Sequence, residues 1–189
     1  MSRRLFVFDD PDRFATGTVG QPGSRTFFLQ ASAAGRVVSV VIEKTQVSAL
    51  AERLGELLIE LDRQGIANDP PAPIAKDERP LDEPLNEAFR TGSLTLGWDG
   101  EAERILVEAR AQIEVESIEE AIEALQQDED DDEEGPDLLR VRITPDAARS
   151  FVAQAQRVVR AGRPPCPLCG NPLEPTGHIC PRKNGHYLN

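Results

Sequence analysis

Twice in this chain, a strand-like run of residues leads directly into a helix-like run. Residues 36–43 (RVVSVVIE) and 138–143 (LLRVRI) are rich in the β-branched and apolar residues that favour strands. After each run, the spacing of the apolar residues changes from about two to the 3.6 of an amphipathic helix. The apolar face of the first helix contains Val47, Leu50, Ala51, Leu54, Leu57, Leu58 and Leu61, and that of the second contains Ala148, Phe151, Val152, Ala155, Val158 and Val159. This order restricts the chain to folds that pack helices against a sheet.

Further strand-like runs precede both of these units. They lie at 4–8, 13–20 and 25–32 before the first helix, and at 87–100 and 103–116 before the second. Short breaks containing Gly, Pro, Ser or Asp separate the runs and predict hairpins, so we expect antiparallel strands in each half. Thr45 and Thr144 are the predicted N-caps of the helices, and Gly65 is the predicted end of the first helix.

The two halves also resemble each other in sequence. When Val40 and Ile42 are aligned with Val141 and Ile143, the helical faces superpose position by position. Upstream, FATGTV in the first half resembles FRTGSL in the second. This likeness has two interpretations. Either it arises because any two strand-to-helix units align at some offset, or the sequence contains a true repeat. We favour the repeat and predict an α+β fold, in which two βββα repeats form an antiparallel sheet or sheets packed with two helices.

Composition shifts divide the chain into four segments. Residues 1–66 form the first half, and residues 67–86 contain five prolines without periodicity, which predicts an extended, exposed linker. Residues 87–162 form the second half. Its acidic run at 126–137 (QQDEDDDEEGPD) predicts a solvated loop at the rim of the fold. Residues 163–189 form a short tail.

The charge of the chain limits its partners. A formal net charge of −12 repels polyphosphate over most of the surface, which disfavours nucleic-acid binding by bulk charge. No run approaches the roughly 20 apolar residues of a membrane span, and the apolar run after MSRR is too short for a secretory signal. We therefore expect a cytoplasmic protein that does not enter a membrane.

All three cysteines lie within fifteen residues of one another in the tail. Cys166 and Cys169 have the two-residue spacing that lets both thiolates reach one tetrahedral ion, and Cys180 supplies a third. The fourth ligand is His178 or His186, the only histidines in the chain; we favour His178 because it shares a loop with Cys180. A Cys₃His set with this spacing suits zinc better than an iron–sulfur cluster, so we predict a small C-terminal zinc ribbon.

Other interpretations of the cysteines are less consistent with the sequence. A redox pair of Cys166 and Cys169 would normally begin a helix, and Pro172 makes a helix there awkward. Unliganded thiols are the remaining alternative. A catalytic zinc would need an open coordination position and a nearby general base, of which Glu174 is the nearest candidate. We therefore favour a closed, structural zinc site.

The tail CPLCG…GHICPRKNG, together with FDDPDRFATGTVGQPGSRTFFLQA and VVIEKTQV in the first half, resembles the actinobacterial domain-of-unknown-function family DUF3090. The resemblance extends over the whole chain, and the tail motif is its most specific part. It implies that Cys166, Cys169, His178 and Cys180 belong together as a set. It carries no assigned activity.

Three functions follow as hypotheses. The leading one is a non-enzymatic interaction or adaptor protein whose ribbon contacts a protein partner. The second is a single-stranded nucleic-acid-binding protein, because the strand-and-helix repeat is similar in layout to PUR-type binders and Arg182 and Lys183 make the tail locally basic. The third is a hydrolase that uses carboxylates, since 33 acidic residues hide any catalytic pair. A Ser-His-Asp triad is disfavoured because both histidines lie in the zinc-ligand segment.

Overall fold

The computed structural model describes residues 3–66, 77–113, 135–162, 166–169 and 180. These residues form seven strands and two helices, close to the predicted positions. In chain order they are β1 (Leu5–Asp9), β2 (Arg13–Val19), β3 (Thr26–Ala33), β4 (Arg36–Ile42), α1 (Lys44–Arg63), β5 (Glu87–Asp99), β6 (Arg104–Ala111), β7 (Leu138–Ile143) and α3 (Pro145–Arg160).

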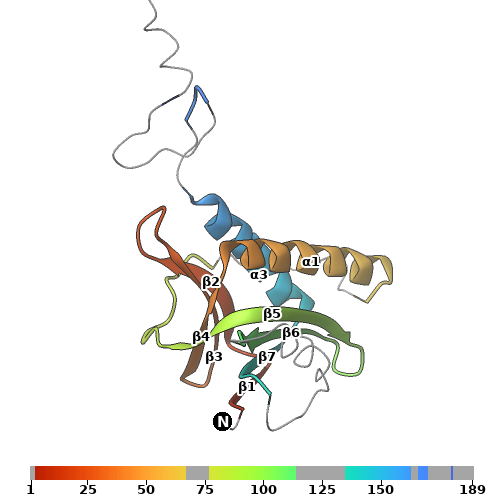
Figure 1. Ribbon diagram of the computed structural model, residues 1–189. Coiled ribbons are helices and arrows are strands. Elements are labelled where there is room, and N and C mark those ends of the chain that lie inside the picture. Colours follow the sequence, from red (N-terminus) through yellow and green to blue (C-terminus); the bar gives the residue numbers. More distant parts are fainter. Residues whose placement is uncertain (1–2, 67–76, 114–134, 163–165, 170–179, 181–189) are drawn as a thin grey trace, which may run out of the picture.

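The strands form one mixed sheet in the order β1-β7-β6-β5-β4-β3-β2, and α1 and α3 pack together over one face of it (Figure 1). The chain is therefore α+β, as predicted. The expectation of purely antiparallel pairing is wrong at two places, because β4 pairs with β5 and β1 pairs with β7 in parallel. Between β4 and β5 the chain crosses over through α1, and a crossover through a helix returns the next strand in the same direction.

After β1, the described elements follow the order of three strands and a helix twice. The two triplets join edge to edge through β4 and β5 instead of forming separate sheets. The related FATGTV and FRTGSL runs each place a glycine at a close approach. A Cβ atom on Gly17 would lie 2.7 Å from Cγ of Leu81, and one on Gly92 would lie 2.8 Å from Cα of Gln112. Both strands therefore need a residue without a side chain at this position.

The ends of the helices follow the predicted signals in two of three cases. Thr144 caps α3, with its Oγ1 accepting a hydrogen bond of 3.1 Å from the main-chain N–H of Ala147. Gly65, just past the end of α1, has a φ of +70°, the left-handed conformation typical of a residue that terminates a helix. Thr45 is not the N-cap of α1, because the N-cap is Glu43, two residues earlier, and the side chain of Gln46 accepts a hydrogen bond from the main chain of Glu43.

The hydrophobic core lies between the helices and the sheet. Leu29, Val40, Leu54 and Ile105 contribute fully buried side chains from three strands and α1. Phe151 of α3 is 1% exposed, and its ring stacks on that of Phe14 in β2 with 4.7 Å between centroids. Both predicted apolar helix faces therefore point into one shared core.

Only residues 135–137 of the predicted acidic loop lie within the described part of the chain. Asp137, the last acid of the run, accepts hydrogen bonds from the main chain and the guanidinium of Arg4, next to β1. Partial burial alone would raise the pKa of Asp137, but these hydrogen bonds lower it below its ordinary value. This contact connects residues 133 positions apart in the sequence and places β1 beside β7.

The described part of the proline-rich segment is held against the fold. We call residues 77–85 the strap. Arg13 of β2 donates hydrogen bonds to the carboxylates of Asp77 and Asp82, and Gln30 of β3 pairs with the main chain of Asp82. The sequence predicted an exposed linker and not these contacts, because its proline content does not show which buried polar side chains a segment hydrogen-bonds. The remaining linker residues, 67–76, lie outside the described residues.

Asp77 makes the strap sensitive to acid. Partial burial alone would raise the pKa of Asp77, but hydrogen bonds from Arg79 and Arg13 outweigh this and lower the pKa from 3.8 to about 2. The charged carboxylate therefore stabilises the folded state above pH 3.8, and this contribution is lost as the pH falls towards 2.

Asp77→Asn is therefore expected to lower the free energy of unfolding by about 1–2 kcal/mol at pH 7, after allowance for solvent screening. The difference from wild type should shrink between pH 4 and pH 2, which urea unfolding at a series of pH values measures. Glu78→Gln is the control, because its side chain is 72% exposed and it removes the same charge from the same segment. An Asp77→Asn difference that stays constant from pH 7 to pH 2 would contradict this assignment.

Candidate metal centre

The three cysteines come together beyond the end of α3. Cys166 and Cys169 lie on one turn, and Cys180 joins them from further along the tail. The three sulfur atoms lie within 4.8 Å of one another, and Sγ of Cys166 lies 4.0 Å from Sγ of Cys180. All three are free cysteines, and Cys166 and Cys180 are each 6% exposed. The cluster is thus a compact set of two buried thiols and one half-buried thiol.

The main chain of the turn points towards one of these sulfurs. The N–H groups of Cys169 and Leu168 donate hydrogen bonds to Sγ of Cys166, with a distance of 3.4 Å from the Leu168 nitrogen. These hydrogen bonds, that from Cys169 first, lower the pKa of the Cys166 thiol and favour its thiolate form. A metal-binding cysteine acts as the thiolate, so the local backbone suits this role.

The spacing of the sulfurs fits a tetrahedral metal ion. Zinc–sulfur bonds of about 2.3 Å place two sulfurs of a tetrahedron about 3.8 Å apart. The 4.0 Å between Cys166 and Cys180 is close to that value. Within the described part of the chain, these three cysteines form the one group of three or more potential metal ligands. Three sulfurs leave one position for a fourth ligand, and the candidates, His178 and His186, lie outside the described residues.

A comparison with protein-family models adds to this geometry. The model described as "Protein of unknown function (DUF3090)" matches residues 6–180, from β1 to the third cysteine. The chain belongs to the DUF3090 family. The match confirms the predicted resemblance and includes Cys166, Cys169 and Cys180. No curated protein and no solved structure matched the chain.

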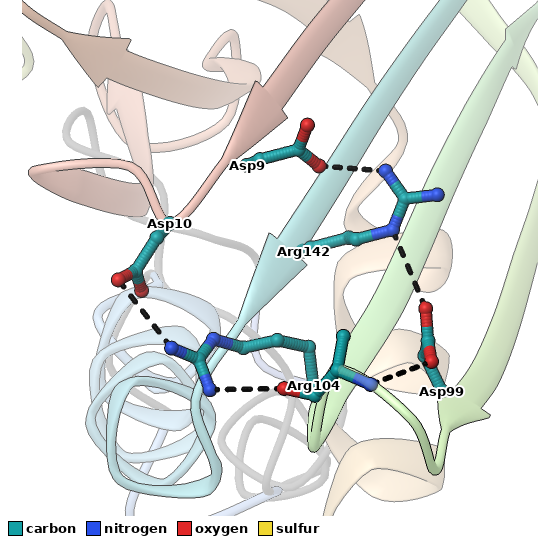
Figure 2. A pocket seen from close by; sticks show the side chains of 6 residues that line it. Asp9, Asp10, Asp99, Arg104 and Arg142 are labelled. Atoms are coloured by element: carbon teal, nitrogen blue, oxygen red, sulfur yellow. Dashed lines mark hydrogen bonds and ion pairs between the residues drawn. The ribbon is translucent and has the colours of Figure 1, made fainter.

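Apart from the cysteine cluster, this DUF3090 protein has a shallow hollow of about 390 Å³ at one end of the sheet, lined mainly by acidic residues and arginines. Figure 2 shows Arg142 of β7 between the carboxylates of Asp9 and Asp99, with Arg104 facing Asp10. The nitrogen–oxygen distances are 2.6 Å from Arg142 to Asp9, 3.8 Å from Arg142 to Asp99 and 3.5 Å from Arg104 to Asp10. Each carboxylate therefore faces a guanidinium.

These ion pairs connect different parts of the sheet, so the charged residues of the hollow have a structural role. Asp99 also accepts hydrogen bonds from the main-chain N–H groups of Glu101 and Ala102, which closes the hairpin between β5 and β6. Asp12 likewise accepts one of 2.8 Å from the N–H of Ala34. The sequence alone does not reveal the arginines that face Asp9 and Asp10, because they lie on other strands. The only available signal was the presence of arginine at alternate strand positions.

Two further sequence-based predictions, on the cysteine turn and on membrane-spanning helices, concern described residues of this DUF3090 protein. Cys166 to Cys169 form a turn, so these residues do not begin the helix that a redox pair would normally need. Among the described residues, no helix is both long and apolar enough to cross a membrane.

Proposed function

We propose that this DUF3090 protein is a zinc-binding interaction protein. Cys166, Cys169, Cys180 and His178 bind one structural Zn²⁺, and the tail that zinc folds presents a docking surface to a protein partner. The observation that supports this most strongly is the convergence of three buried or half-buried cysteine sulfurs within 4.8 Å.

A structural role follows from the number of ligands. Three thiolates and one imidazole complete a tetrahedral zinc site and leave no open position for a reacting water. His178 is preferred to His186 because it lies two positions before Cys180, and because the family match ends at residue 180. A tail of this length cannot bury a core of its own, so the free energy of metal binding would fold it.

An interaction role is supported by an exposed apolar residue on the metal-binding turn. Leu168 lies between two cysteine ligands, and it is 50% exposed although it is a large hydrophobic residue. Zinc would hold this turn rigidly, so the side chain would be ordered before a partner binds. Ordering a contact residue in advance lowers the entropy cost of association.

The two other functions predicted from the sequence receive less support. Single-strand binders stack bases on exposed aromatic rings, whereas the adjacent rings of Phe27 and Phe28 in β3 are 9% and 8% exposed. A hydrolase that uses carboxylates needs two carboxyl groups arranged around a substrate. In the hollow of Figure 2, the carboxylates instead face arginines.

The proposed interaction is tested by affinity purification of the protein from its host cell. We expect the bound partners to be lost in Leu168→Ser and in Cys166→Ser, because the first removes the apolar contact and the second removes the metal. Ile59→Ser is the matched control, since Ile59 is an apolar residue of similar exposure, 53%, on α1. Partners that persist in Cys166→Ser would show that the zinc-bound tail does not recruit them.

A further inference from the structure

The strap occupies a site that contacts it through buried polar side chains. Arg13 of β2 has a side chain that is 5% exposed, yet its guanidinium makes four contacts with the strap. Nε donates to the carboxylate of Asp77, and Nη1 donates to the carbonyl of Pro80 at 2.8 Å and to the carboxylate of Asp82 at 2.9 Å. Nη2 donates to the carbonyl of Arg79 at 3.0 Å. One buried arginine thus contacts both carboxylates and two carbonyls.

Gln30 of β3 contacts the main chain of the strap. Gln30 is 1% exposed. Its side-chain amide accepts a hydrogen bond of 2.8 Å from the N–H of Asp82 and donates one of 3.0 Å to the carbonyl of Asp82. This two-way pairing resembles the contact between neighbouring β-strands. Ser32 adds a hydrogen bond of 3.0 Å to the carboxylate of Asp82. Unpaired buried polar groups are costly, so these side chains require an extended segment in this place.

Sequence selectivity comes from the side chains of the strap. The side chain of Leu81 lies against Gly17, where any Cβ atom would clash at 2.7 Å. Asp77 and Asp82 pair with the buried guanidinium of Arg13, and Pro80 offers a carbonyl without needing to donate an N–H. The site, which we call the strap groove, therefore fits the pattern Asp-x-x-Pro-Leu-Asp, found here at residues 77–82.

We propose that the strap groove is a peptide-binding site, occupied here by the chain's own strap, and that an acidic Asp-x-x-Pro-Leu-Asp segment of a partner protein binds there in its place. The strap is held mainly by polar contacts, and the side chains of Glu78 and Arg79 are 72% and 68% exposed. A partner segment with the same pattern can make each of these contacts in turn, so exchange leaves no buried polar group unpaired.

The surroundings favour a partner segment over a second copy of the chain. A hollow of about 470 Å³ lies beside the strap, between β2 and α3, and is lined by Val19 and Val158 among others, so a longer ligand has room there. The strap ends at residue 85 and β5 begins at Glu87. A copy could therefore not donate its strap to a neighbour without pulling the start of β5 out of the sheet.

The test uses the full-length protein and a fluorescent peptide with the sequence of residues 77–85, DERPLDEPL. Asp77→Asn combined with Asp82→Asn weakens the strap but keeps its main-chain contacts to Gln30 and Arg13. We expect the peptide to bind this double variant about tenfold more tightly than wild type by fluorescence anisotropy, because the wild-type strap competes at a high effective concentration. If the double variant does not fold, Asp82→Asn alone serves the same comparison.

Two controls separate this site from general charge attraction. A peptide with both aspartates changed to asparagine is expected to bind the double variant about tenfold more weakly, because it loses the charge-assisted hydrogen bonds to Arg13. Arg13→Lys in the double variant should remove this preference, since lysine cannot make the same forked contacts.

Equal binding of the acidic peptide to wild type and to the double variant would overturn the proposal, as would equal binding of the two peptides. A wild-type dimer in light scattering that dissociates in the double variant would assign the strap groove to a second copy of the chain, and would overturn the proposal of a partner segment.

Discussion

Replacing Cys180 by serine is expected to lower the affinity of the protein for Zn²⁺ by more than about a hundredfold, since loss of a supporting residue alone costs 10–100-fold and loss of a ligand costs more. Cys180 is 6% exposed, and its sulfur lies 4.0 Å from Sγ of Cys166. Serine keeps the size of the side chain but does not provide a thiolate. Competition with a chromophoric zinc chelator measures the change.

The two histidines give this prediction an internal control. His178→Ala is expected to weaken zinc binding because His178 is the proposed fourth ligand, whereas His186→Ala should leave the affinity near the wild-type value. Weaker binding in His186→Ala alone would transfer the fourth position to His186. Wild-type affinity in Cys180→Ser would show that the three cysteines do not share one ion.

Phe151→Ala is expected to lower the free energy of unfolding by about 3–5 kcal/mol, the usual cost of removing a buried aromatic side chain. Phe151 is 1% exposed, and its ring stacks on Phe14 with 4.7 Å between centroids. The contact joins α3 to β2, the edge strand at the far end of the sheet from β1. The variant therefore leaves a cavity where the second helix meets the strands of the first half.

Urea unfolding followed by circular dichroism measures this loss. Gln156→Ala on the same helix is the control, because Gln156 is exposed and its substitution should change the stability by less than about 0.5 kcal/mol. A similar small change for Phe151→Ala would mean that α3 does not pack on β2 in solution as it does in this structure.

The sequence predicted the elements well because each depends on nearby residues. The change of period after Ile42 and after Ile143 locates both helices, and Thr144 marks the start of α3 through its own hydrogen bond to Ala147. Pairing of strands was less predictable. The parallel neighbours β4–β5 and β1–β7 depend on where the crossover returns the chain and on the contact of Arg4 with Asp137, neither of which has a local pattern.

The candidate sites show the same division. The spacing of Cys166 and Cys169 is local, so the candidate metal-ligand motif could be recognised directly, and the structure brings Cys180 to it. The strap groove was missed because its parts are distant in sequence. Arg13 and Gln30 lie in strands that bury mostly apolar residues, and a charged or amide side chain at such a position is a signal that some other segment must pair with it.

The zinc content of the purified full-length protein is the most direct measurement of whether the tail is a metal centre. Atomic emission analysis after exhaustive dialysis is expected to find about one zinc per chain, with the three thiols protected from alkylation until a chelator is added. Protein that carries no zinc, even when it is expressed and purified with zinc present, and that reacts at all three cysteines at once would contradict the proposed site.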